Sequence, residues 1–237
     1  MLKKEITEII SAARQAGWVM EPEAKRLLAM AGLDVPRFKW AKNLDHALQS
    51  AHEIGYPVVG KVVSSHVVHK SDQGGVVVGI DSDETLKNTY RRFSAVDHFA
   101  GMLVEDMVSG VELIVGAKID YQFGPVILLG MGGTGVEIYK DAVLRMAPLE
   151  EKDVSSMVEN LKAHPLLEGY RGSEPVDRKK FFRMMKAFSD LVMELKEVIA
   201  SIDLNPVMCS SKRCVVADAR ILLQLEEGVH PSGVRFT

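Results

Sequence analysis

The sequence predicts an α+β protein built from two lobes. Runs of predicted strands are separated from runs of predicted helices, which favours two α+β lobes over a repeated βαβ sheet. The chain has 237 residues, of which 47% are hydrophobic and 26% are charged, so it can bury a core as one large domain or two small ones. We expect one lobe at residues 1–104 and the other at residues 105–237.

The first half of the chain contains four predicted helices and two predicted strands. A proline in the first turn, a polar N-cap or a following glycine marks the ends of these helices. We expect helices at 3–16, from Glu21-Pro22 to Gly32, from Asn43 to 54 and from about 81 to 95, strands at 56–63 and 74–80, and an extended segment or short strand at 33–38.

The second half consists mainly of strands, with two helices between them. Its runs rich in valine, leucine and isoleucine are bounded by glycine and polar residues, which is typical of strands. We expect strands at 103–108, 111–119, 125–131, 136–144, 201–209 and 214–223, and helices at 150–162 and from Asp177 onwards.

Charge and hydropathy argue against several classes of protein. The formal net charge is −3, whereas nucleic-acid-binding proteins usually carry a basic footprint. No apolar run reaches the roughly 20 residues that a membrane helix needs. Glu5, Thr7 and Glu8 interrupt any signal-peptide pattern at the N-terminus, so we expect a cytoplasmic protein.

The two cysteines, Cys209 and Cys214, do not form a zinc site by themselves, and the downstream His230 is a poor additional ligand. We expect both to be small side chains of strands. A disulfide between them is disfavoured in a reducing cytosol.

Residues 64–76 join two predicted strands, yet this short connection carries unusual chemistry. Gly74 and Gly75 allow the backbone to approach phosphates closely and to present N–H donors. Lys61, on the preceding strand, offers a point charge for a phosphate. The imidazole of His69 can serve as a base, a metal ligand or a phosphoryl acceptor. These residues alone leave open an ordinary hairpin with solvated polar side chains.

The last two predicted strands place two oxygen ligands opposite each other. With the turn centred at 211–212, Asn205 lies directly opposite Asp218. The same register puts Asp203 opposite Arg220, and opposed residues have Cβ atoms about 4.5–5.5 Å apart. Few oxygen ligands, with room for water and phosphates, suit Mg²⁺. A register error of one residue would remove the pairing, but Asn and Asp are poor strand formers, so their placement favours metal binding.

Residues 130–135, GMGGTG, match the dinucleotide-binding pattern G-x-G-x-x-G, and Glu150 follows about 20 residues later. A Rossmann site needs a helix directly after the glycines, but VEIYKD alternates and Pro148 follows soon after. A tight turn between antiparallel strands explains the glycines better. An NAD-binding oxidoreductase stays open as an alternative function.

Five segments together resemble, in order, the ATP-grasp β subunit of ADP-forming acetyl-CoA (acyl-CoA) synthetase. The resemblance extends from about residue 21 to residue 222. It implies an ATP-grasp fold with a nucleotide cleft between two α+β lobes, ATP or ADP as substrate and Mg²⁺ as cofactor. The segments are GYPVVGKVVSSHVVHKSDQGGVVVGI, LVEDMVSGVELIVGAKID, FGPVILLGMGGTGVEIYKDAVLRMAPL, LLEGYRG and IDLNPV.

The implied reaction is acyl-CoA + ADP + phosphate ⇌ carboxylic acid + CoA + ATP. In the family, CoA binding and acyl-phosphate formation belong to an α subunit or a fused region. We therefore expect this chain to need an α subunit, in an α2β2 assembly. A histidine of the α part carries the phosphoryl group, and a second histidine, in the HKSD motif, helps to deliver it to ADP. That second histidine falls on His69.

The resemblance also implies roles for the remaining site residues. Asp203 resembles the acidic residue that orients the phosphohistidine, and Asn205 and Asp218 match the magnesium ligands. Residues 105–108 match a hinge that meets adenine through its backbone. The implied nucleotide-binding residues are Lys61, Gly74, Gly75, Glu105, Met107, Val108, Glu112 at the ribose, and Arg145.

Two further alternatives stay open. A succinyl-CoA synthetase β subunit shares the fold, but it normally lacks the HKSD histidine and has a further C-terminal domain. A non-catalytic subunit that senses ATP would need no phosphoryl carrier. Gly60, Ser65 and Gln73 depart from the family pattern, and none of them removes a group with an assigned role.

Overall fold

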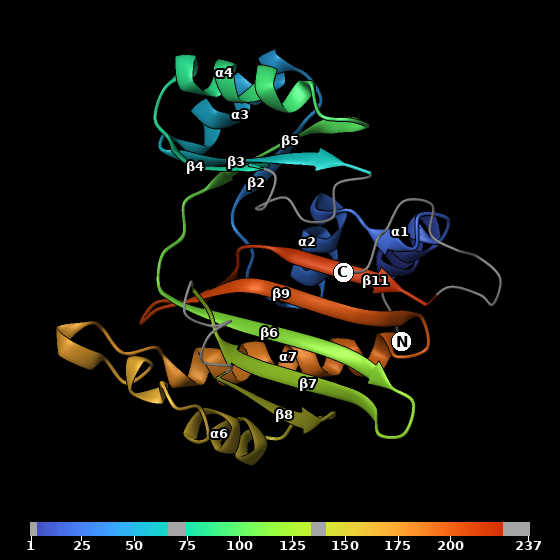
Figure 1. Cartoon of the computed structure of the whole chain (residues 1–237), viewed down its shortest axis with the longest axis vertical. Helices are drawn as coiled ribbons and strands as arrows, with labels where there is room; N and C mark the ends of the chain where they lie inside the picture. Colours follow the sequence, from blue (N-terminus) through green and yellow to red (C-terminus); the bar gives the residue numbers. More distant parts are fainter. Residues whose placement is uncertain (1–3, 66–73, 134–140, 225–237) are drawn as a thin grey trace. The chain divides into compact units, whose positions relative to one another are not determined.

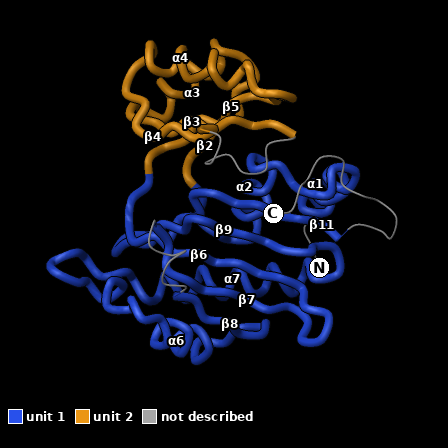
Figure 2. Tube along the Cα trace, viewed as in Figure 1, with its two compact units in different colours: residues 1–35, 108–228 blue, residues 36–107, 229–237 orange. Residues whose placement is uncertain are grey.

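The computed structural model describes residues 4–65, 74–133 and 141–224 (Figure 1). The chain divides into two compact units (Figure 2). Unit 1 comprises Met1–Val35 and Val108–Gly228, and unit 2 comprises Pro36–Met107 and Val229–Thr237. Both units combine helices with antiparallel sheets, so the predicted α+β class is confirmed.

The first 35 residues belong to unit 1, which differs from the expected lobe at 1–104. Helices α1 (Lys4–Ala13) and α2 (Glu21–Met30) bury Ile10, Leu27 and Leu28 in the same core as the strands of the second half. Between these helices, β1 (Trp18–Val19) pairs with the last strand of the chain. A strand of two residues is too short to show a period of two in the sequence, so this long-range contact had no local signal.

Unit 1 is built on a seven-stranded antiparallel sheet. Its strand order is β1-β11-β9-β6-β7-β8, and β10 pairs with β9. The strands are β6 (Val111–Asp120), β7 (Gly124–Met131), β8 (Ala142–Met146), β9 (Ile199–Cys209), β10 (Cys214–Val216) and β11 (Ala219–Leu223).

Helix α7 (Arg178–Leu195) packs against one face of this sheet, which we call the α7 face. The carboxylate of its N-cap, Asp177, accepts a hydrogen bond from the Lys180 N–H (3.1 Å). Phe188 and Val192 of α7 pack with Leu113 and Leu204 of the sheet, and α6 (Glu151–Glu159) joins the same core. The residues that alternate with the buried ones lie on the opposite face.

Unit 2 is a four-stranded antiparallel sheet in the order β2-β5-β3-β4. Helices α3 and α4 cover one of its faces, where Val62, Leu86, Phe93 and Met102 form the core (Figure 1). The elements are β2 (Phe38–Ala41), α3 (Leu44–Ile54), β3 (Val58–Ser64), β4 (Val76–Ile80), α4 (Asp83–Ser94) and β5 (Phe99–Asp106).

Most predicted element ends are confirmed. Asn43 caps α3 through a hydrogen bond from the His46 N–H (2.8 Å), and Ser82 caps α4. The extended segment at 33–38 is not a strand, because Pro36 cannot donate to a ladder, and β2 begins at Phe38. The predicted strand at 136–144 lies largely outside the described residues, and β8 begins at Ala142. Short helices follow at η2 (His164–Leu166) and η3 (Tyr170–Gly172). No described helix is both long and apolar enough to cross a membrane.

A polar cluster ties α3 to α4 in unit 2. The Asp83 carboxylate lies 2.7 Å from Nε2 of His52 and accepts a hydrogen bond from the Tyr56 hydroxyl (2.9 Å). The bond to His52 and then that to Tyr56 lower the pKa of Asp83. Burial and the bond to Asp83 raise the pKa of Tyr56. The cluster therefore stabilises unit 2 when Asp83 is ionised.

We predict that Asp83→Asn lowers the urea midpoint of unfolding at about pH 5, and that this deficit shrinks as the pH falls towards about 2. A depressed folded pKa stabilises the protein above the unfolded value of about 3.9, and this contribution is lost as the pH falls through the folded pKa. Asp97→Asn is the control, since Asp97 is an exposed residue of unit 2 outside this cluster; an equal, pH-independent deficit in both variants would contradict the prediction.

Candidate functional site

The C-terminal hairpin has the register that the sequence predicts. Cys209 pairs with Cys214, and Asp203 pairs with Arg220 on the next part of the same hairpin. Between these pairs, the backbone N–H of Asn205 donates to the carbonyl of Asp218 (3.2 Å). The hairpin therefore brings Asn205 and Asp218 side by side, which confirms the predicted alignment.

A β-bulge sharpens the placement of Asn205. In the pairing of β6 with β9, the register shifts between Leu113 and Val115, so that two residues of β9 lie opposite one of β6. The two residues are Asn205 and Pro206, which follow the buried Leu204. Bulges of this kind re-aim a side chain and occur next to functional sites.

Asn205 and Asp218 fit a magnesium site of few protein ligands. Asn205 is exposed and Asp218 is half-buried, and one carboxylate oxygen of Asp218 accepts the Ala219 N–H (3.0 Å). Among the described residues, no group of three or more His, Cys, Asp and Glu side chains could hold a metal ion. Asn205 offers a neutral amide oxygen and Asp218 a carboxylate oxygen. Few protein oxygens, with room left for water and phosphate, are what Mg²⁺ prefers.

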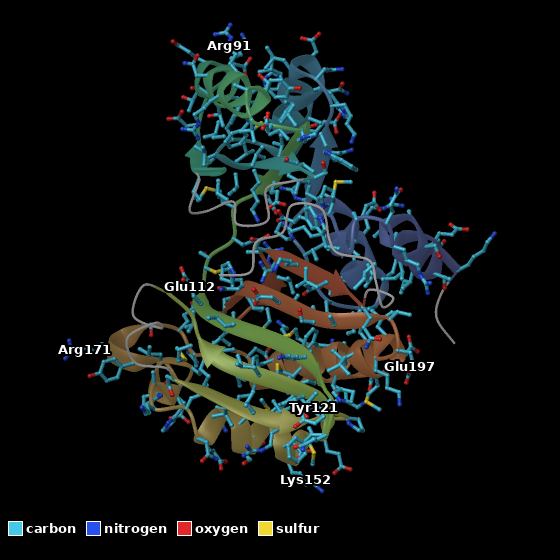
Figure 3. The ribbon with its side chains drawn as sticks, turned by 45° about the vertical axis from the view of Figure 1, so that its right-hand side comes forward. Arg91, Glu112, Tyr121, Lys152, Arg171 and Glu197 are labelled. Carbon is cyan, nitrogen blue, oxygen red and sulfur yellow. The ribbon has the colours of Figure 1, made fainter. Side chains whose placement is uncertain are left out.

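Asp203 lies on the face of the sheet opposite α7. It is directly opposite Gly116 of β6, whereas its neighbours Ile202 and Leu204 are buried in the core. Glu112 lies on the same face, four residues before Gly116, and is exposed (Figure 3). Asp203 and Glu112 thus share one face of two neighbouring strands, and Asn205 lies in the bulge between their levels.

Two glycines, Gly132 and Gly133, lie against Glu112, and no sequence pattern indicated this contact. The Gly132 N–H donates to the Glu112 carbonyl (2.7 Å), and a Cβ at Gly132 would lie 2.8 Å from two atoms of Glu112. A Cβ at Gly133 would lie 3.5 Å from Oε2 of Glu112. Only a residue without a side chain fits at Gly132.

These glycines belong to GMGGTG, and the structure excludes a Rossmann unit there. The strands on either side of the motif, β7 and β8, are antiparallel neighbours, whereas a βαβ unit needs parallel strands. Residues 134–140, which comprise the end of the motif and the five residues after it, lie outside the described residues.

Arg145 is not brought to this set of residues. It pairs with the core residue Ile127 and therefore lies on the α7 face. Its guanidinium donates to the Ser156 hydroxyl of α6 (2.8 Å) and to the Leu144 carbonyl (2.8 Å). In the structure, Arg145 anchors α6 to the sheet. The alternation of side chains along β8 predicts the face of Arg145 only when the buried face of that strand is known.

Unit 2 carries a separate set of the predicted site residues. Nζ of Lys61 lies 3.4 Å from Oε2 of Glu105, and both side chains are almost fully buried. Lys61 is opposite Leu103 on β5, so it points away from the face that α3 and α4 cover. The resemblance implied a backbone role for Glu105, and the ion pair with Lys61 was not expected.

The backbone of Glu105 is already part of the sheet. Glu105 pairs with Val59 on one side and with Phe38 on the other. Met107 and Val108 follow after the end of β5, where the chain passes from unit 2 to unit 1. Among the residues expected to meet adenine through their backbone, Met107 and Val108 are the two that lie beyond this ladder.

Gly60 and the end of the 64–76 connection are also explained. A Cβ at Gly60 would lie 2.2 Å from Cε of Met102, so the methionine side chain fills that space. Gly74 has a φ of 66°, and its carbonyl accepts a hydrogen bond from Arg92 (3.1 Å). The Gly75 carbonyl accepts the Val62 N–H (2.9 Å). Both glycines are thereby tied to unit 2, and His69 lies outside the described residues.

Cys209 and Cys214 are buried, free thiols that face each other across the hairpin. The hydrogen bond between the two thiols and burial raise the pKa of Cys209. They are small strand side chains, as expected.

Comparisons with known proteins agree with this arrangement. Residues 11–223 match the model of the ATP-grasp domain family. The chain is 42% identical over 231 residues to the β subunit of ADP-forming acetate–CoA ligase II of Pyrococcus furiosus, covering 93% of this chain and 97% of that subunit. The chain belongs to the ATP-grasp β subunits of ADP-forming acetyl-CoA synthetases.

Two further relatives of this synthetase family are informative. ADP-forming acetate–CoA ligase I of Archaeoglobus fulgidus is 38% identical, but 93% of this chain covers only 33% of that protein. A solved structure of acetyl-CoA synthetase 1 from Candidatus Korarchaeum cryptofilum superposes with a TM-score of 0.82 and 38% identity, covering 92% of this chain and all of that chain.

We predict that Lys61→Met alone destabilises the β subunit by about 3–5 kcal/mol, because it removes the ammonium group that lies beside the buried Glu105 carboxylate. The double variant Lys61→Met/Glu105→Leu should recover most of this loss, since replacing a whole buried pair by apolar groups is often neutral. Urea unfolding of the wild type, both single variants and the double variant measures the coupling. Equal losses in the Lys61→Met variant and the double variant would contradict it.

Gly132→Ala should cost about 1–3 kcal/mol of stability, because its Cβ would overlap Glu112. Gly116→Ala, on the same face, is the matched control: a Cβ there would lie 3.5 Å from the Ile202 carbonyl oxygen, an ordinary contact. Thermal unfolding of both variants tests this difference, and equal melting temperatures would refute the close approach.

Proposed function

We propose that this chain binds ATP or ADP and transfers a phosphoryl group between nucleotide and a phosphohistidine formed on His69. The complete reaction is acyl-CoA + ADP + phosphate ⇌ carboxylic acid + CoA + ATP. It needs a CoA-binding partner subunit, and we propose an α2β2 assembly for the pair.

One observation carries the proposal: the hairpin register that aligns Asn205 with Asp218 and puts Asp203 on the same face as Glu112. Two oxygen ligands on the same hairpin as the Asp203 carboxylate are the parts that nucleotide-dependent phosphoryl transfer uses. Asn205 and Asp218 would hold Mg²⁺, which neutralises charge on the nucleotide phosphates when bound.

The residues of unit 1 have distinct tasks in this mechanism. Glu112 accepts hydrogen bonds from the ribose hydroxyls. Asp203 accepts a hydrogen bond from one ring nitrogen of His69 and thereby fixes the tautomer in which the other nitrogen is the nucleophile. When ATP is formed, an oxygen of the β-phosphate of ADP attacks phosphorus, the P–N bond breaks, and the released electron pair returns to the imidazole.

In unit 2, Lys61 supplies a positive charge for the nucleotide phosphates. The ion pair with Glu105 fixes the position of Nζ. The ammonium group of a flexible surface lysine would have no fixed position. Met107 and Val108 offer backbone groups to the adenine, and Gly74 and Gly75 end the connection that carries His69.

Structures of the Korarchaeum synthetase support a carrier histidine. One contains coenzyme A and Mg-AMPPCP with the phosphohistidine segment pointing towards the nucleotide-binding site. Another contains a phosphorylated phosphohistidine segment in the site I orientation. In that protein the segment is therefore seen in two orientations, which suits a carrier between two sites.

The test uses γ-labelled ATP and Mg²⁺ with the purified chain, alone and together with its CoA-binding partner. We expect acid-labile, base-stable label on the wild type and none on His69→Ala. His66→Ala is the matched control, because it removes a histidine of the same segment, three residues before His69. It should keep the label.

Two other outcomes would be decisive. Label on His69→Ala but not on His66→Ala would move the carrier to His66. If His69→Ala in the assembled complex kept full acyl-CoA synthesis, the chain would be a subunit that only senses nucleotide.

A further inference from the structure

The β6–β7 turn and the edge strand β8 carry a concentration of exposed apolar side chains, which we call the turn patch. Four of its members belong to the exposed large hydrophobic residues of the chain: Tyr121 (90% exposed), Phe123 (64%), Leu144 (58%) and Met146 (60%). Apolar patches of this kind, rich in aromatic residues and methionine, are typical of protein interfaces.

The turn presents its two aromatic rings on a fixed backbone. The Asp120 carboxylate accepts hydrogen bonds from the N–H groups of Gln122 (2.8 Å) and Phe123 (3.0 Å). The bond from Phe123 and then that from Gln122 lower the pKa of Asp120. Gly124 closes the turn with a φ of 72°, which other residues rarely adopt. A turn whose backbone is held in this way loses little backbone entropy on binding.

The patch is continuous from the turn to the edge of the sheet. Met146 is directly opposite Val126, and Leu144 is directly opposite Leu128, all on the face away from α7. Val126 and Leu128 are half-buried, and they join the exposed residues of β8 to the turn. Lys118, directly opposite Val126 on β6, is exposed and borders these four positions on the side of β6.

The position of the patch along β6 relates it to the proposed chemistry. Glu112, the proposed ribose contact, stands at the start of β6, and Asp203 is level with Gly116. Tyr121 stands just beyond the far end of the strand (Figure 3). The order along the strand is therefore nucleotide, then the acid that serves the phosphohistidine, then the turn patch. A partner docked on the turn patch therefore leaves Glu112, at the other end of the strand, uncovered.

The relatives show that the remainder of the enzyme need not be covalently attached. The Pyrococcus furiosus β subunit has nearly the same extent as this chain, whereas in the Archaeoglobus fulgidus protein the matching region is one third of a single chain. In a divided enzyme, noncovalent contacts must replace the covalent link.

We propose that the turn patch is the docking surface for the CoA-binding partner subunit, with Tyr121 and Phe123 as its anchors. This inference rests on the proposed function. It places the partner at the end of β6 away from Glu112, and it assigns a use to aromatic rings that would otherwise be exposed to water.

The experiment measures the affinity of the full chain for the CoA-binding subunit of the same organism, by titration calorimetry. We expect Tyr121→Ser and Phe123→Ser each to weaken binding at least tenfold, and the double variant at least 100-fold. Tyr170→Ser is the matched control, since Tyr170 is a half-exposed aromatic residue on a different turn of unit 1. It should bind like the wild type.

A second readout separates this inference from the proposed function. In the absence of the partner, the melting shift caused by Mg-ATP should be the same in all variants, because the patch lies outside the nucleotide residues. Normal nucleotide shifts together with unchanged partner affinity in the double variant would overturn the docking inference alone. So would a wild type that binds nucleotide but does not bind the partner. A wild type without any nucleotide shift would instead overturn the proposed function.

Discussion

The antiparallel register around β9 is the constraint on which the rest of unit 1 depends. β9 is paired with β6 on one side and with β10 and β11 on the other, so its register fixes three strands at once. Because side chains alternate with a period of two, a slip of one residue would bury Asp203 and expose Leu204. The apolar core against α7 therefore enforces the alignment of the polar face. Stability and site geometry are consequences of the same pairing.

The charged residues of the candidate site are accommodated differently in the two units. In unit 1, Glu112 and Asp203 stand on the face that is not buried against α7, where water and phosphates can solvate them. In unit 2 Lys61 and Glu105 are buried, so each satisfies the charge of the other. A buried pair contributes little net stability, since desolvation offsets the attraction. Its value is positional: Nζ is held on the face of β3 away from α3 and α4.

Much of this arrangement could be predicted from local sequence. Asn43, Ser82 and Asp177 act as caps through hydrogen bonds to residues three positions away, which are local by nature. The hairpin register was also predictable, because only a short turn separates its strands. The face on which Arg145 lies was not predictable, because it depends on which side of β7 and β8 receives α6 and α7. The N-terminal helices were assigned to the other lobe because their partner, β11, lies about 200 residues later in the chain.

Glycine explains how the two ends of β6 can serve different purposes. At the start of the strand, Gly132 lets the following backbone lie directly against Glu112, so the acidic side chain is supported without being covered. At the far end, Gly124 reverses the chain within a turn that Asp120 holds by two hydrogen bonds. The first end suits a small polar ligand, which needs a firm backbone and accessible oxygens. The second suits a macromolecule, which needs a rigid apolar projection. A single strand of ten residues thus separates the proposed nucleotide end from the proposed partner end.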